Sequence, residues 1–198
     1  MRSSRSFLFA AALLLASSSA QAAILEFSTT LNGSSQVPPN ASAATGSAFV
    51  FLNTSAQTLA VDISFTGLSA PASGAHIHCC APAGSNAGVA IPFTAFPATT
   101  SGVYTNTFDL TAAATYETAF LTTNGGAPSS AEAALVTGLE DGLAYVNIHD
   151  VNFPGGEIRG QLAAIAPGPA PGAGLAGLIF AGALLGWRLS KREVEATG

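Results

Sequence analysis

The alternation of hydrophobic and polar residues predicts a chain made mostly of β-strands. Runs in which every second residue is apolar, or in which β-branched and aromatic residues cluster, are separated by groups of Gly, Pro, Asn and Ser. The predicted strands cover residues 23–31, 46–53, 58–68, 74–80, 102–110, 143–150 and 157–165. Two segments, 114–126 and 129–142, have helical spacing instead. In the second, Ser130 is suited to cap the start of a helix, and Gly138 or Gly142 to end it.

This order of elements predicts an all-β fold. We expect a Greek-key antiparallel β-sandwich of the immunoglobulin or superoxide-dismutase type, with one or two short helices in a connection. The last two predicted strands are joined by residues 150–156, which can close an antiparallel hairpin. In the strand 143–150 the aliphatic residues face the core. Tyr145, Asn147 and His149 then share a polar face, which we expect to point outward.

The N-terminal residues have the three parts of a secretory signal peptide. Two arginines precede an apolar run from Phe7 to Ala16, and small residues follow it up to Ala20-Gln21-Ala22. The run is too short to span a bilayer as a lasting anchor. We therefore expect residues 1–22 to be removed and the mature chain to begin at Ala23.

The C-terminal residues predict a membrane or sorting segment. A Pro/Gly linker, 167–172, leads to the apolar residues 173–187, and residues 188–198 form a tail that is first basic and then acidic. As a helix, 173–187 would reach about 22 Å, less than the roughly 30 Å hydrocarbon core of a bilayer, and the basic residues after it should stay in the cytoplasm. The segment resembles the PEP-type C-terminal sorting signals of Gram-negative bacteria, which a sorting protease of the exosortase type processes.

The PEP-type resemblance has one departure. The usual Val-Pro-Glu-Pro start is replaced by Pro167-Gly168-Pro169-Ala170-Pro171. An ordinary single-span C-terminal anchor is the alternative. In both cases we expect the domain 23–166 to be exported, to the periplasm, the outer surface or the extracellular space, with at least transient anchoring in the membrane.

The charge of the domain excludes one class of partner. Between residues 23 and 166 the only Lys or Arg is Arg159, against nine Asp and Glu residues, which leaves a net charge of −8. Nucleic-acid binding needs several cations to contact phosphates, so we exclude it.

Several motifs, taken in order, resemble the chordin-type (CHRD) domain. They cover about residues 25 to 163 and are Leu31–Pro39 with Thr45-Gly46, Ala75-His76-Ile77-His78, Gly88-Val89-Ala90, Tyr145–His149 and Pro154–Leu162. The resemblance implies an extracellular β-sandwich module of bacterial surface proteins and of the growth-factor antagonist chordin, and it implies no known reaction. Members of that family commonly have a glycine after the His-Ile-His run, where this chain has Cys79-Cys80.

The three histidines are the strongest chemical signal in the chain. His76 and His78 flank Ile77 on a predicted strand, so their rings share one face, and His149 lies on the polar face of its own strand. If these strands are neighbours, three imidazoles converge and can bind Zn²⁺ or Cu²⁺. The alternative is a hydrogen-bonded network of neutral histidines that only fixes the geometry of the strands.

The two cysteines, Cys79 and Cys80, allow more than one interpretation, and so does Arg159, the one cationic residue of the domain. In an oxidising compartment the two cysteines can form a vicinal disulfide, remain free or intermolecular thiols, or add one thiolate to the histidines on a metal. For Arg159 we expect a structural ion pair with Glu157 or Asp150, or binding to backbone carbonyls, in preference to a role as a substrate anchor.

The motifs of common enzymes are missing from the sequence. It contains no Gly-x-Ser-x-Gly element and no glycine-rich phosphate loop with a lysine. A copper dismutase needs about four histidines for copper alone, and this chain has three. We therefore expect a non-catalytic, secreted or surface-tethered binding or structural module of the bacterial envelope or matrix, whose partner is an extracellular polysaccharide or a surface protein. The alternative is a histidine-based metal-binding envelope protein, with Zn or Cu and with possible redox activity.

Overall fold

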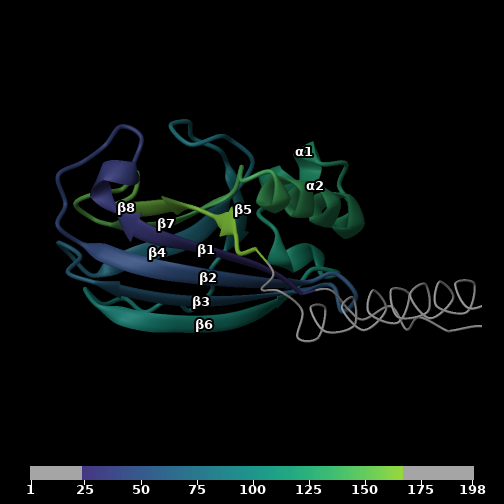
Figure 1. Cartoon of the computed structure of the whole chain (residues 1–198), viewed down its shortest axis with the longest axis horizontal. Coiled ribbons are helices and arrows are strands. Elements are labelled where there is room, and N and C mark those ends of the chain that lie inside the picture. The colour runs from purple at the N-terminus through teal and green to yellow at the C-terminus, as the bar shows by residue number, and fades with distance from the viewer. Residues whose placement is uncertain (1–23, 167–198) are drawn as a thin grey trace, which may run out of the picture.

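The computed structural model describes residues 24–166, which form one curled sheet with two short α-helices (Figure 1). The strands are β1 (Ile24–Asn32), β2 (Thr45–Asn53), β3 (Thr58–Thr66), β4 (Ala72–His78), β5 (Val89–Pro92), β6 (Gly102–Asp109), β7 (Tyr145–Asp150), β8 (Ile158–Gln161) and β9 (Ala163–Ala164). The helices are η1 (Gly33–Ser35), η2 (Ala113–Thr115), α1 (Thr118–Thr123) and α2 (Pro128–Glu140).

The predicted signal peptide, linker, apolar sorting segment and charged tail all lie outside the described residues. Within residues 24–166, no helix has the length and apolar character needed to cross a membrane.

The sheet is antiparallel and continuous. Its strand order is β5-β4-β7-β8-β1-β2-β3-β6, with β9 paired to β1. The expected all-β class with two short helices is confirmed. The expected separation into two facing sheets is not: in the described part of the chain all nine strands belong to one hydrogen-bonded sheet, which curls so that β6 lies on the opposite side from β8 (Figure 1).

The core lies inside this curl and is filled by alternate residues of the strands. In β3, Leu59, Val61 and Ile63 are buried and Asp62 is exposed, as a strand with one wet face requires. The helices close one end of the curl (Figure 1), where Leu135 and Leu139 of α2 join the same core.

Several elements differ from the predicted ones: the strand 157–165 is divided into β8 and β9, and the helix 114–126 into η2 and α1. Helix α2 begins at Pro128, which occupies the first turn, so Ser130 is not its cap. The predicted stop at Gly142 is confirmed, because this glycine has φ +68° directly after the helix. Strand β5 was not predicted from alternation, since it is only four residues long and ends in Pro92.

The polar face of β7 does not point outward, which corrects the prediction. Tyr145 is 2% exposed and Asn147 is 3% exposed. Two loops, 33–40 and 79–88, cover this face: the Gln36 side chain donates to Asn147 Oδ1, and the Ala87 N–H donates to the Tyr145 hydroxyl. In Figure 1, η1 of the first loop lies over β8. Most residues of β7 and β8 are therefore buried on both faces.

Asp150 and Glu157 form a buried carboxyl pair at the ends of the β7–β8 hairpin. Both are 0% exposed. Ser69 donates to both carboxyl groups and Ser42 donates to Glu157, so the pair ties two further loops to the hairpin. Burial raises the pKa of Glu157. Burial also opposes ionisation of Asp150, but hydrogen bonds, first among them one from Glu157, hold its pKa below the usual value. Of the two carboxyl groups, Glu157 is therefore the one that is harder to ionise.

The raised pKa of Glu157 should make stability depend on pH. A carboxyl whose pKa is raised on folding contributes stability below the unfolded pKa, about 4.3, and loses it as the pH rises through the folded value. Glu157→Gln keeps a donor toward Asp150 but cannot ionise. The free energy of unfolding should therefore fall between pH 5 and pH 8 more in the wild type than in Glu157→Gln. Denaturant titrations at both pH values measure this difference.

The matched control is Glu140→Gln, which removes the same charge from an exposed position of α2. Its pH dependence should follow the wild type. If the free energy of unfolding changes equally with pH in all three proteins, Glu157 is already ionised in the folded state.

Candidate metal centre

The three histidines meet on the face of β4 and β7 that the loops cover. His76 and His78 lie on β4, where they pair with Asn147 and Tyr145 of β7. His149 pairs with Gly74, whose missing side chain leaves space beside the His76 ring. The ring centroids are 5.6 Å apart for His76 and His78, 5.1 Å for His76 and His149, and 6.1 Å for His78 and His149.

The nitrogen atoms of these rings are arranged as a ligand set. One ring nitrogen from each histidine lies within 4.8 Å of the other two. His78 is buried, whereas His76 and His149 are partly exposed. The structure therefore brings all three predicted ligands together.

Hydrogen bonds decide which nitrogens are available. Nδ1 of His78 lies 2.9 Å from the carbonyl oxygen of Ala87, and Nδ1 of His149 lies 2.9 Å from that of Pro154. A carbonyl only accepts, so each Nδ1 carries the proton and each Nε2 keeps a lone pair. Such a carbonyl contact is the usual support for a metal-binding histidine, because it fixes the tautomer and the orientation of the ring.

The remaining nitrogens are buried without a partner. His76 Nδ1, His78 Nε2 and His149 Nε2 are the only buried side-chain N or O atoms among residues 24–166 that lack a hydrogen bond. Buried polar atoms are normally satisfied, so three exceptions in one place need an explanation. A cation held by the three lone pairs provides one.

The protonation state suits a metal ligand. Burial, and then repulsion from His149 and His78, lower the pKa of His76 to about 4. Burial also lowers the pKa of His78. Both rings are therefore neutral at pH 7, and a neutral imidazole is the form that binds metal. Three imidazole nitrogens suit Zn²⁺ or Cu²⁺.

Tyr145 and Arg159 support His78 from one side, which the sequence pattern did not reveal. The Tyr145 ring stacks on His78 with centroids 4.7 Å apart and planes at 3°, and the Arg159 guanidinium carbon lies 3.4 Å from the centroid of the Tyr145 ring. The Tyr145 hydroxyl donates to Ala87 O, the carbonyl that also holds His78. Tyr145 thus positions His78 both directly and through the covering loop.

Arg159 does not form the expected ion pair. Its guanidinium donates to Asn86 Oδ1, Ser85 O and Gln161 Oε1, so its partners are neutral. Glu157 and Asp150 bind each other and the two serine-containing loops instead. The alternative of binding to a backbone carbonyl describes Arg159 better than the ion pair does.

Cys79 and Cys80 are joined by a disulfide, the first of the three alternatives. It follows His78 directly and starts the covering loop. Neither sulfur is free to bind the metal. A Cβ added at Gly138 of α2 would overlap Sγ of Cys79 and lie 2.5 Å from Sγ of Cys80. Helix α2 can therefore approach the disulfide only because position 138 has no side chain.

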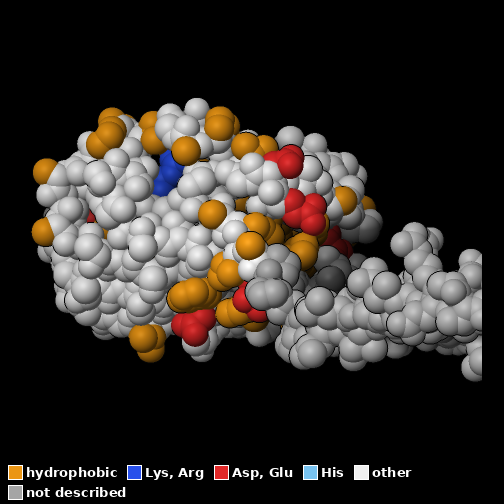
Figure 2. All heavy atoms as spheres, viewed as in Figure 1, with side chains coloured by type: hydrophobic (Ala, Val, Ile, Leu, Met, Phe, Trp, Pro, Cys, Tyr) orange, Lys and Arg blue, Asp and Glu red, His pale blue; other side chains and the backbone are white. Residues whose placement is uncertain are grey.

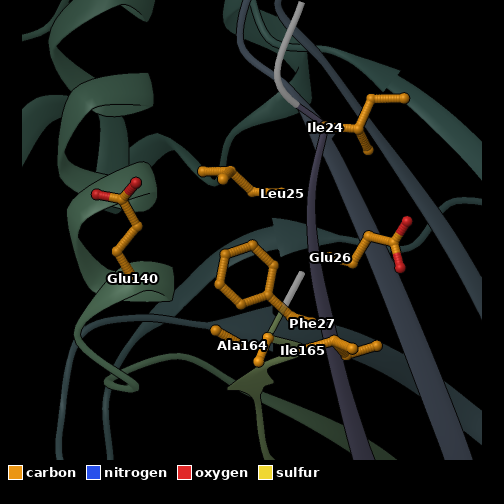
Figure 3. A pocket seen from close by; sticks show the side chains of 8 residues that line it. Ile24, Leu25, Glu26, Phe27, Glu140, Ala164 and Ile165 are labelled. Atoms are coloured by element: carbon orange, nitrogen blue, oxygen red, sulfur yellow. The ribbon is translucent and has the colours of Figure 1, made fainter. Parts of the chain in front are cut away.

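One cavity of the described chain has none of the three histidines in its lining. It has a volume of about 520 Å³ and lies beside the start of β1 and strand β9 (Figure 3). Leu25 and Phe27 give it an apolar lining. The carboxylates of Glu26 and Glu140 point away from one another (Figure 3), so they do not form an acid–base pair for hydrolysis.

A protein-family model described as the CHRD domain matches residues 27–162. The sequence matches no curated protein and no solved structure.

Because Gly138 contacts the disulfide, we expect a methyl group added at position 138 to lower the stability of the protein. Gly138→Ala should destabilise the protein by about 1–3 kcal/mol, the usual result of overpacking a tight site. For a domain of this size each kcal/mol lowers Tm by roughly 2–4 °C. Thermal unfolding followed by circular dichroism without reductant measures the change.

Gly88→Ala is the matched control, because nothing lies within 4 Å of a Cβ at this exposed position. Its Tm should stay close to that of the wild type. If the two variants unfold at the same temperature, the close packing of α2 on the disulfide is wrong.

Proposed function

This chain belongs to the CHRD domain family, and from that premise we propose that it is an extracellular binding module that holds one transition-metal ion on His76, His78 and His149. The observation that carries the proposal is the convergence of three buried ring nitrogens without a hydrogen-bond partner. A purely structural histidine network would need donors at these atoms. The described residues supply none.

The ion in this proposal is Zn²⁺ or Cu²⁺. Both accept imidazole nitrogens, and three protein ligands leave room for a further ligand from outside. The protein would contribute fixed ring orientations through the carbonyls of Ala87 and Pro154 and through the Tyr145 stack. We propose that the role is binding or structural and not catalytic, because the sequence offers no nucleophile motif and the Glu26–Glu140 cavity no acid–base pair.

A metal titration tests the site. Purified, tag-free and metal-free full chain should bind one Zn²⁺ per molecule in isothermal titration calorimetry, and excess metal should raise Tm. At a free Zn²⁺ concentration 100 times Kd the gain is about 2.7 kcal/mol. His76→Asn and His149→Asn should each abolish this binding. The chain has no other histidines outside the site, so background binding by imidazole is not expected.

Asp62→Asn controls for unspecific binding to the acidic surface, since Asp62 is exposed on β3. It should leave the titration unchanged. No heat at micromolar Zn²⁺ or Cu²⁺, with all three histidines present, would overturn the proposal.

We further propose that the domain works outside the cytoplasm. Family membership supports an extracellular module, and the sequence of residues 1–22 supports export. The C-terminal residues 167–198 support transient anchoring and processing of the PEP type, in an envelope whose polysaccharide or surface proteins are the partners.

Intact mass spectrometry tests this processing. Protein recovered from outside the cytoplasm of an expressing Gram-negative host should begin at Ala23, because cleavage follows Ala20-Gln21-Ala22. Replacing Ala20 and Ala22 by Phe should block cleavage, whereas Ser18→Ala should not. A chain that keeps its first residues when both Ala20 and Ala22 are intact would contradict export by this signal.

A further inference from the structure

We propose that a second site, the Arg159 pocket, binds a carboxylate-bearing monosaccharide unit, that is, a uronic acid of an extracellular polysaccharide. The pocket lies between the two covering loops. It has a volume of about 320 Å³, and its lining includes Ser34, Ser35, Gln36, Ala83, Gly84, Gln161 and, at its base, Arg159. This inference rests on the polysaccharide partner proposed above and specifies its chemical class. It does not require a metal on the histidines.

The first argument is a buried cation without an anion. Arg159 is 2% exposed, and its hydrogen bonds within residues 24–166 go only to neutral groups. Burial lowers the pKa of its guanidinium. Buried charges are ordinarily paired, because an unpaired charge loses hydration without compensation. An anion in the pocket would supply the missing partner.

The second argument concerns the donors that Arg159 has left. A guanidinium has five N–H groups, and three hydrogen bonds are made by its terminal nitrogens. About two donors, including Nε–H, are therefore free for an oxyanion. The face of the guanidinium is held on Tyr145, which fixes the direction of these donors. Both N–H groups of Nη2 are used, so a carboxylate oxygen would accept a single charge-assisted hydrogen bond from Nε–H or from Nη1–H.

The third argument concerns the walls. Most donors of the wall side chains are already used: Ser34 and Ser35 hydroxyls donate to Asn32, Gln36 donates one of its two N–H groups to Asn147, and Gln161 donates to Ala81 O and Gly142 O. Apart from the second N–H of Gln36, these side chains offer a ligand their oxygen lone pairs. Hydroxyl groups donate to such acceptors, so the ligand should carry hydroxyls as well as a carboxylate.

The pocket has the size and access for one sugar unit. Its volume lies at the lower end of small-molecule sites, about 300–1,000 Å³. In Figure 2 a blue, cationic side chain is visible at the bottom of a hollow between loops, and Arg159 is the only Lys or Arg among residues 24–166. A polymer can reach such an open site along its length, whereas a closed cavity would admit only a free monosaccharide.

Saturation-transfer NMR on the purified, metal-free full chain tests the site. D-galacturonate should bind with a Kd of roughly 1 mM or tighter, and added salt should weaken it. D-galactose and acetate, which each lack one half of the recognised chemistry, should bind at least about tenfold more weakly. The proposal is overturned if galactose or acetate binds as tightly as galacturonate. It is also overturned if galacturonate does not bind at about 10 mM, ten times the expected Kd.

Two variants locate the site. Ala83→Glu places a carboxylate on the exposed rim and should weaken galacturonate binding about tenfold or more. Ala114→Glu makes the same change at an exposed position of η2 that does not line the pocket, and it should leave binding unchanged. Arg159→Met should abolish binding, and the Ala83 variant keeps the test valid if Arg159→Met fails to fold. Binding that Ala83→Glu leaves intact would place the sugar elsewhere and reject the Arg159 pocket. Because no metal is present, these outcomes are independent of the zinc titration.

Discussion

Burying a polar sheet face is possible only when each donor and acceptor on it finds a partner, and this requirement governs the centre of the fold. Strands β4, β7 and β8 have an aliphatic face in the core and a polar face beneath two loops. The backbone and side chains of those loops supply the partners of Asn147, Tyr145 and Arg159. The three imidazole nitrogens are exceptions, and they lie together. The proposed ion is placed there because every other buried side-chain nitrogen and oxygen of the described residues has a hydrogen-bond partner.

Tyr145 connects this point with the Arg159 pocket. Its ring has His78 on one face and the Arg159 guanidinium on the other. An aromatic ring suits both neighbours, because its face attracts a cation and also stacks on a neutral imidazole. The ring also keeps the guanidinium away from the ligand nitrogen of His78. Two sites that each favour a charged group can therefore lie side by side without direct contact between a metal ion and an arginine.

The sequence predicted most of the strands, and it predicted that the histidines converge if their strands are neighbours, because the face on which each side chain lies follows from local alternation. His76 and His78 share a face by spacing alone, and His149 joins them once β7 pairs with β4. The burial of their face was not predicted, since alternation along a strand does not show where the loops 33–40 and 79–88 fold. The ion pair of Arg159 with Glu157 was wrong for a related reason. Glu157 precedes the first residue of β8, so strand alternation does not extend to it, and it turns toward Asp150 and Ser69.

The disulfide explains how a loop of ten residues, 79–88, holds so many partners in place. At its start, the Cys79–Cys80 bond packs against Gly138 of α2. Its two ends are also joined, because the Cys79 N–H donates to Gly88 O, and Ala81 is tied to Leu143 O. Between these anchors lie the carbonyl of Ala87 that orients His78 and the groups of Ser85 and Asn86 that bind Arg159. Where the CHRD resemblance leads one to expect a glycine, this chain has a disulfide that packs against helix α2. The positions of the histidine site and of the Arg159 pocket thus both depend on the contact between the disulfide and Gly138, which lies outside both sites.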